Sequence, residues 1–151
     1  MSSADIASWA QAFAALVGLL FVWYQIRQAT GQARDALQQD RVAKTIEACD
    51  RYDSDPLIDA ALRKLSKDSS SGKLKKNPAS DKIELVTVMN YFDGIAICLR
   101  ESVFDEAIAK EQIGEIMIVH YRDLVSSGIA VQAGIKMTDY ANLTALVEKW
   151  Q

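Results

Sequence analysis

Two patterns of hydropathy divide the chain. From Ile6 to Ile26 the sequence reads IASWAQAFAALVGLLFVWYQI, 21 residues without a charge, whereas beyond Arg27 apolar residues recur at helical spacing between polar ones. A helix of that length spans about 31 Å at a rise of about 1.5 Å per residue, close to a hydrocarbon core of about 30 Å. The first pattern therefore predicts a transmembrane helix. The alternative, a buried helix of a soluble domain, is less favoured because such helices are usually shorter and amphipathic.

The residues that flank this segment predict its orientation. Trp9 lies near one end, Trp23 and Tyr24 lie near the other, and Arg27 follows, as in the aromatic belts of membrane interfaces. Asp5 is the only charged side chain before the segment. The basic side chains after it are Arg27, Arg34, Arg41 and Lys44. The positive-inside rule then predicts that the N-terminus lies outside and the C-terminal part lies in the cytoplasm.

Small and polar residues recur along the same segment. Ala10, Ala14 and Gly18 repeat every four residues, and Gln11, Gly18 and Gln25 repeat every seven. Small residues allow close approach of helix backbones, and a glutamine in lipid is costly unless it finds a partner. We expect this face to pack against another membrane helix, from a second copy or another subunit. The alternative is chance, because Ala and Gly are common in membrane helices.

Residues 28–52 continue the helical pattern with a thin apolar stripe. The stripe comprises Ala29, Ala33, Leu37, Val42, Ile46 and Cys49 or Tyr52. Because the first half is rich in Gln and Ala, burial alone does not stabilise it well. We interpret it as a neck, either a self-associating stalk or a segment held by a partner, with a frayed linker as the alternative. The predicted organisation is an anchor over residues 1–27, a neck over 28–52 and a helical bundle over 53–151.

Helix signals recur through the rest of the chain. Asp55 and Pro56 predict the start of a short helix that reaches Leu65. An exposed loop is expected over residues 67–80, then helices over about 82–102, 104–126 and 138–150. The helix over about 82–102 is predicted to begin with an Asp81-x-x-Glu84 cap. Since no segment alternates with period two, the fold class is all-α.

Basic side chains concentrate in and around the expected loop. Residues 63–82 contain seven of them: Arg63, Lys64, Lys67, Lys73, Lys75, Lys76 and Lys82. We expect a solvated loop. Contact with anionic lipid headgroups is the alternative.

Composition and motifs limit the ligands and reactions that we expect for this chain. A net charge of -3 and a pI near 5.2 argue against a nucleic-acid partner. No nucleotide-binding, hydrolase or metalloprotease motif occurs, so no cofactor, metal site or small-molecule substrate is expected. Cys49 and Cys98 are interpreted as core-filling residues. Asp93 lies among apolar residues, so we expect a structural polar cluster in which Arg100, Arg122 or His120 supplies its partner, with Arg122 favoured.

Four short runs resemble a group of uncharacterised bacterial proteins with one N-terminal membrane helix and a helical domain of unknown function. The runs are residues 90–96 (NYFDGIA), 104–105, 118–122 and 140–143 (YANL). The chain has Arg122 where that pattern leads us to expect an aromatic residue after Tyr121. The resemblance covers the anchor and most of residues 80–150. It implies an architecture and a bacterial inner-membrane location, and no activity.

These observations lead to one functional hypothesis and one alternative. The first is a non-enzymatic, single-pass membrane protein in the lipid bilayer, acting as a homo-oligomeric scaffold or an accessory subunit of a larger membrane complex. The alternative is a membrane-anchored signalling or defence effector with a cytoplasmic sensing bundle.

Overall fold

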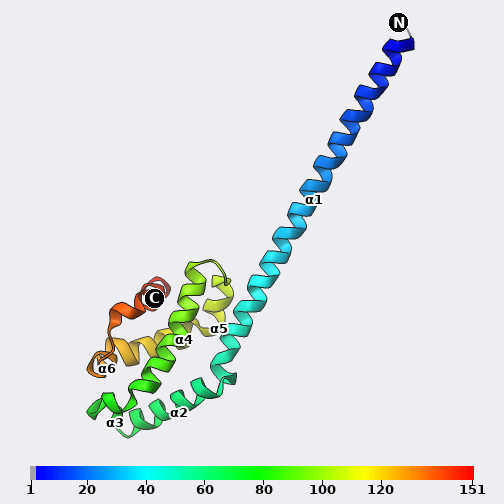
Figure 1. Ribbon diagram of the computed structural model, residues 1–151. Coiled ribbons are helices and arrows are strands. Elements are labelled where there is room, and N and C mark those ends of the chain that lie inside the picture. The colour runs from blue at the N-terminus through cyan, green and yellow to red at the C-terminus, as the bar shows by residue number, and fades with distance from the viewer. Residues whose placement is uncertain (1–2) are drawn as a thin grey trace. The chain divides into compact units, whose positions relative to one another are not determined.

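The computed structural model describes residues 3–151, apart from the side chains of residues 3–8, 10, 12 and 14. All regular elements in this range are helical, which confirms the all-α class (Figure 1). In order they are α1 (Ser3–Ser54), α2 (Pro56–Ser70), α3 (Lys73–Lys76), η1 (Pro78–Asp81), α4 (Lys82–Arg100), α5 (Glu106–Tyr121), η2 (Arg122–Ser126), α6 (Ile129–Gln132), η3 (Met137–Tyr140) and α7 (Ala141–Trp150). The chain forms two compact units, one up to Asp40 and one from Arg41 to Gln151.

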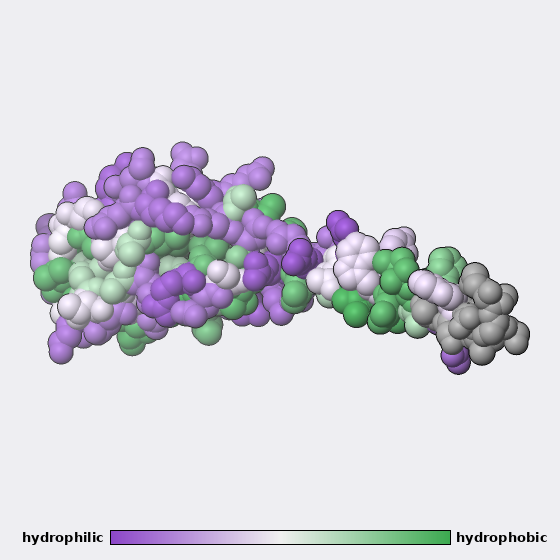
Figure 2. Space-filling model, turned by 90° about the horizontal axis from the view of Figure 1, so that it is seen from above, coloured by the Kyte–Doolittle hydropathy of each residue, from purple (hydrophilic) through white to green (hydrophobic). Residues whose placement is uncertain are grey.

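In the first unit the apolar side chains are exposed to solvent. The described residues from Leu16 to Ile26 are all exposed, among them Leu19 at 69%, Leu20 at 58% and Phe21 at 60%. Figure 2 shows this apolar surface on the N-terminal unit. Exposed apolar area is unfavourable in water, at about 25 cal/mol per Å², so this unit gains little stability from burial within the described residues.

The start of α2 follows the local sequence signals. Pro56 occupies the first helical turn, and the side chain of Asp55 accepts a hydrogen bond from the Leu57 backbone N–H at 2.8 Å. This confirms the predicted Asp55–Pro56 start. The helix buries Ile58, Ala61 and Leu65 on one face.

The expected exposed loop at residues 67–80 is wrong. Instead α2 continues to Ser70, and α3 and η1 occupy most of the remaining residues. Leu74, at 1% exposed, is inserted into the core, and Pro78 is also buried. One buried leucine therefore holds a segment whose composition is otherwise typical of a loop.

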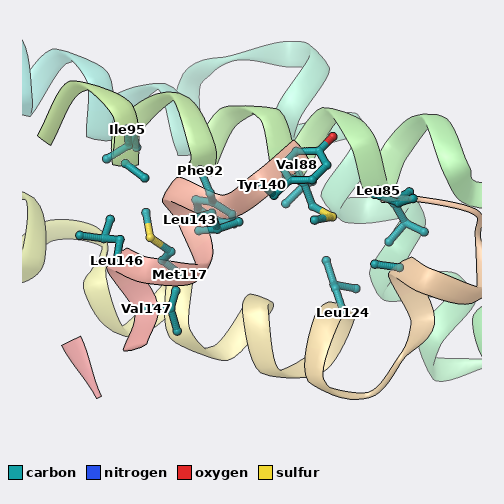
Figure 3. Packing of buried hydrophobic residues seen from close by; sticks show 14 of the residues in the cluster. Leu85, Val88, Phe92, Ile95, Met117, Leu124, Tyr140, Leu143, Leu146 and Val147 are labelled. Carbon is teal, nitrogen blue, oxygen red and sulfur yellow. The ribbon is translucent and has the colours of Figure 1, made fainter. Parts of the chain in front are cut away.

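The core of the second unit lies between α4 and its neighbours α2, α5 and α7. Figure 3 shows side chains from α4, α5, η2 and α7 converging there. The helix expected over residues 138–150 is formed by η3 and α7, and its large apolar side chains are buried: Tyr140, Leu143, Leu146, Val147 and Trp150. On α5, Ile116 is 36% exposed.

The beginnings of α4 and α5 differ. Asp105 caps α5, since its side chain accepts from the Ile108 N–H at 3.1 Å. Asp81 makes no such bond at the start of α4, so the predicted capping box is wrong. Its carboxylate lies 3.2 Å from the Lys64 ammonium and accepts from the Ser80 hydroxyl at 3.0 Å. Burial raises the pKa of Asp81, but these two donors outweigh it and hold that pKa below its ordinary value.

Candidate functional site

A tyrosine–histidine pair joins the end of α1 to α5. The hydroxyl of Tyr52 and Nε2 of His120 are 2.9 Å apart. Both rings pack on Phe92, with centroid separations of 6.2 Å for Tyr52 and 5.8 Å for His120. Distances of this size are typical of favourable aromatic contacts. Three helices that are distant in sequence therefore meet at one polar contact inside an aromatic cluster.

Both groups of this pair favour the uncharged state. Burial lowers the pKa of His120 below its ordinary value, and the nearby Asp123 carboxylate offsets only part of that effect. Burial also raises the pKa of Tyr52, with a further contribution from Asp53. At neutral pH the contact is thus a hydrogen bond between two neutral groups. It orients the imidazole ring and leaves Nδ1 for other contacts.

Two further contacts fasten the end of α1 to the bundle through backbone groups. The Tyr91 hydroxyl donates to the carbonyls of Ala48 and Cys49, at 3.0 and 3.2 Å. The fully buried Thr45 hydroxyl accepts from the Asp105 backbone N–H at 2.8 Å. Each contact joins a buried or half-buried hydroxyl to a backbone group of another helix, and so fixes the end of α1 against α4 and the start of α5.

Beside the tyrosine–histidine pair lies an open groove with many hydroxyl groups. It consists of two adjoining cavities of about 540 and 510 Å³, which share Ser69, Asp123 and Ile129. Tyr52 and His120 line the first cavity, and Lys75 and Arg122 line the second. Five serines line the two cavities: Ser66, Ser69, Ser70, Ser126 and Ser127. We call this feature the serine groove. Each cavity lies within the size range of ligand sites.

Asp93 does not pair with Arg122 or His120, so that prediction is wrong. Its Oδ1 accepts a hydrogen bond from the Leu143 backbone N–H at 3.0 Å, in a buried position. Arg122 instead donates from Nε to Asp123 Oδ1 at 3.3 Å, on the surface. Leu143 is the third residue of α7, where N–H groups lack partners within the helix. The N-terminus of α7 thus supplies both the donor and the partial positive charge that a buried carboxylate needs.

The residues predicted to act in the membrane helix are only partly described. The side chains of Ala10 and Ala14 lie outside the described residues. Gln11, Gly18 and Gln25 are exposed, and a Cβ added at Gly18 would meet no atom within 4 Å. The interface residues Trp9, Trp23 and Tyr24 are 71%, 58% and 59% exposed. The Arg27 guanidinium lies 5.6 Å from the centroid of the Trp23 ring, a cation–π contact.

The length and apolar character of the described helices bear on the predicted membrane span. Among the described residues, no helix combines the length and the apolar character needed to cross a bilayer. The predicted transmembrane helix is therefore not supported by this finding. Residues 6–8, 10, 12 and 14, which belong to the uncharged segment, have side chains outside the described part.

Ion pairs neutralise part of the basic cluster at residues 63–82. Arg63 pairs with Asp59 at 2.8 Å, Lys64 pairs with Glu84 at 2.7 Å, and Lys73 pairs with Asp68 at 3.3 Å. Lys82 donates to the Gly134 carbonyl at 3.3 Å. Within the described part of the chain this leaves Lys67, Lys75, Lys76 and Lys82 without an acidic partner, and Lys75 lines the serine groove. The charge available to a lipid surface is smaller than the sequence indicates.

The comparisons with known proteins identify the family. A family described as a domain of unknown function (DUF4760) matches residues 12–150. The chain belongs to this family. No curated protein and no solved structure matches the chain.

The DUF4760 assignment agrees with the resemblance to an uncharacterised family and leaves the bacterial origin and the membrane helix unsupported. The matched residues include every residue of the serine groove and of the tyrosine–histidine pair. Both features therefore belong to the DUF4760 domain itself. The family description carries no activity, so the function has to be argued from the residues.

Sequence reasoning found the members of the site without their partners. The sequence predicts His120 as a member of a polar cluster with Asp93, and Tyr52 as a possible member of the apolar stripe of the neck. The two are 68 positions apart in the chain. No spacing rule relates residues so distant, and the serines of the groove are typical of loops in sequence. Helix packing alone brings them together.

Proposed function

We propose that this DUF4760 chain is a non-enzymatic, single-pass membrane protein that acts as a homo-oligomeric scaffold or an accessory subunit of a larger membrane complex. The uncharged segment at residues 6–26, with exposed apolar side chains wherever they are described from Trp9 onward, carries the proposal. It resides in the bacterial inner membrane, with the N-terminus outside and the bundle in the cytoplasm, as the basic residues from Arg27 onward favour.

Extraction of membranes from cells that express the full chain tests the anchor. The chain is expected in the pellet after alkaline carbonate treatment, which removes peripheral proteins. Replacing both Leu19 and Leu20 by Arg should shift it to the supernatant, because each charge at the centre of a span costs about 2.5–3.5 kcal/mol on insertion scales. Leu57→Arg is the matched control, since Leu57 is 75% exposed on α2. A parent chain found in the carbonate supernatant would refute the anchor.

A topology measurement tests the orientation separately. Reporters fused to the C-terminus should be active when they require the cytoplasm and inactive when they require the periplasm. The opposite result would reverse the proposed orientation while leaving the anchor intact.

Assembly is tested through the small and polar residues of the segment. Gly18→Ile places a branched side chain where helices would approach closely, and Gln11→Leu deletes a hydrogen-bonding group. Both variants should reach the membrane and lose crosslinked oligomers or co-purified subunits. Gly31→Ile is the control, since an added Cβ at Gly31 also meets nothing within 4 Å and Gly31 lies outside the uncharged segment. Unchanged crosslinking of Gly18→Ile would exclude this face as the contact.

A second candidate function is a membrane-anchored signalling or defence effector whose bundle senses a signal. The serine groove favours it, because the groove adjoins the tyrosine–histidine pair that holds the end of α1. Purification in mild detergent with identification of co-eluting chains separates the two. A stoichiometric partner subunit supports the accessory role, and a lone oligomer that changes on ligand addition supports the effector.

A further inference from the structure

The serine groove combines two kinds of polar surface. The cavity beside Tyr52 and His120 has serine hydroxyls above a floor of leucines: Leu62, Leu65, Leu74 and Leu124. The adjoining cavity has two cationic side chains, Lys75 and Arg122. An elongated ligand in the groove would therefore meet hydroxyl groups and the Asp123 carboxylate at one end and two cationic side chains at the other.

Three of the five serine hydroxyls that line the groove have no hydrogen bond within the described part of the chain. Ser70 donates to the Lys67 carbonyl and Ser127 donates to the Asp123 carbonyl, as serines in helices commonly do. The hydroxyls of Ser66, Ser69 and Ser126 make no hydrogen bond within the described residues, although all three line the groove. Each can donate one hydrogen bond and accept two. Together with the Asp123 carboxylate, which accepts from ligand hydroxyls, they suit a compound that carries several hydroxyl groups.

The cationic end has capacity for one anionic group. Lys75 has no acidic partner in the described part of the chain, and Arg122 contacts Asp123 through Nε at 3.3 Å, which leaves its terminal amino groups. Two cations and one carboxylate give this end a net charge of about +1. Guanidinium and ammonium groups at one site are typical of phosphate recognition.

We propose that the serine groove binds a small organic phosphate that carries hydroxyl groups, of the sugar-phosphate class. The phosphate lies against Lys75 and Arg122, and the sugar hydroxyls bond to Ser66, Ser69 and Asp123. The sugar ring covers the leucine floor and reaches toward His120. This inference deepens the sensing candidate, but it does not depend on the membrane anchor.

The single histidine of the chain provides a direct readout. The full chain, in the detergent in which it purifies, is titrated with ribose 5-phosphate, and separately with ribose and with inorganic phosphate. Binding is followed by calorimetry and by the imidazole proton signals of His120. We expect ribose 5-phosphate to bind at least about tenfold more tightly than either fragment, and to shift the His120 signals, because it occupies both ends of the groove.

Matched variants locate the binding. Lys75→Gln should weaken binding about tenfold or more, whereas Lys76→Gln, the exposed neighbour that does not line the groove, should not. Ser69→Ala should weaken ribose 5-phosphate without changing inorganic phosphate. Ser71→Ala is its control, because the Ser71 hydroxyl bonds to the Asp68 carbonyl at 3.2 Å.

Three results would overturn the proposal. The first is no heat and no His120 shift up to about 10 mM ribose 5-phosphate. The second is equal affinity for inorganic phosphate and ribose 5-phosphate, which would leave an adventitious anion patch only. The third is binding that Lys75→Gln and Lys76→Gln reduce equally. None of these results bears on carbonate extraction, so failure here and failure of the anchor are distinguishable.

Discussion

The cap that Asp93 provides for α7 gives the sharpest test of the bundle. Asp93→Ala removes the carboxylate that accepts from the Leu143 N–H at 3.0 Å, in a position where Asp93 is 8% exposed. A buried donor left unpaired costs about 1–3 kcal/mol, and loss of a helix cap costs about 0.5–2 kcal/mol. These figures describe the same interaction, so they are not added. We expect the free energy of unfolding to fall by about 1–3 kcal/mol.

Two further variants separate the cap from an ion pair. Asp93→Asn keeps an oxygen acceptor for the Leu143 N–H and loses only the charge, which is worth about 0.3–1 kcal/mol at a helix N-terminus. Arg122→Ala should change stability by no more than about 0.5 kcal/mol, because that side chain is 65% exposed. The cap thus predicts that Asp93→Ala lowers the free energy of unfolding most and Asp93→Asn less, and that Arg122→Ala leaves it close to that of the parent chain.

Urea unfolding of the full chain, followed by circular dichroism, measures these differences. For a chain of this length each kcal/mol corresponds to a shift of about 2–4 °C in the midpoint of thermal unfolding. Amide exchange at Leu143 provides a local check, since loss of its acceptor should raise the rate. The reasoning is refuted if Asp93→Ala unfolds like the parent chain. It is equally refuted if Arg122→Ala costs as much as Asp93→Ala, which would restore the ion pair.

Three further predictions concern buried groups. Because His120 has a lowered pKa in the folded chain, the unfolded chain binds more protons as pH falls below about 6.5; stability should decline between about pH 7 and 5, and His120→Gln should flatten that slope. Equal slopes would contradict this. Thr45→Val removes the hydroxyl that accepts from the Asp105 N–H and should cost about 1–3 kcal/mol in urea unfolding, whereas a loss within about 0.5 kcal/mol would contradict it. Iodoacetamide should label Cys98 before Cys49, whose pKa burial raises to about 11; equal rates by mass spectrometry would contradict this.

Local signals predicted the elements that depend on local interactions. The Asp55–Pro56 start of α2 rests on a cap two residues long, and the buried face of α7 rests on helical periodicity. The prediction of a loop at residues 67–80 was wrong because the structure of that segment depends on one distant contact. Leu74 enters a core formed by residues far along the chain, and no composition rule records that.

The partners of polar groups were the least predictable feature. The sequence shows that Asp93 is a carboxylate in an apolar helix, but its pattern of residue types offers only side-chain cations as donors, whereas the donor is the Leu143 backbone N–H. A helix N-terminus offers the same charge and direction through the backbone, which is invisible in a pattern of residue types. The sequence did not predict the serine groove for a related reason. Serines and a lysine near a glycine are also typical of an exposed loop, so their composition does not indicate a groove.

The groups that folding leaves unused are the best guide to function in this chain. Thr45, Asp93 and Tyr91 each bond to a backbone group of another segment, so their polarity is explained by the fold. The hydroxyls of Ser66 and Ser69 have no such role within the described residues, and neither do the exposed apolar side chains of the segment before Arg27. A hydroxyl without a partner in a groove suits a polar ligand, and an apolar side chain without a core suits apolar surroundings. The proposed ligand site and the proposed membrane anchor therefore rest on two separate observations, and each has its own test.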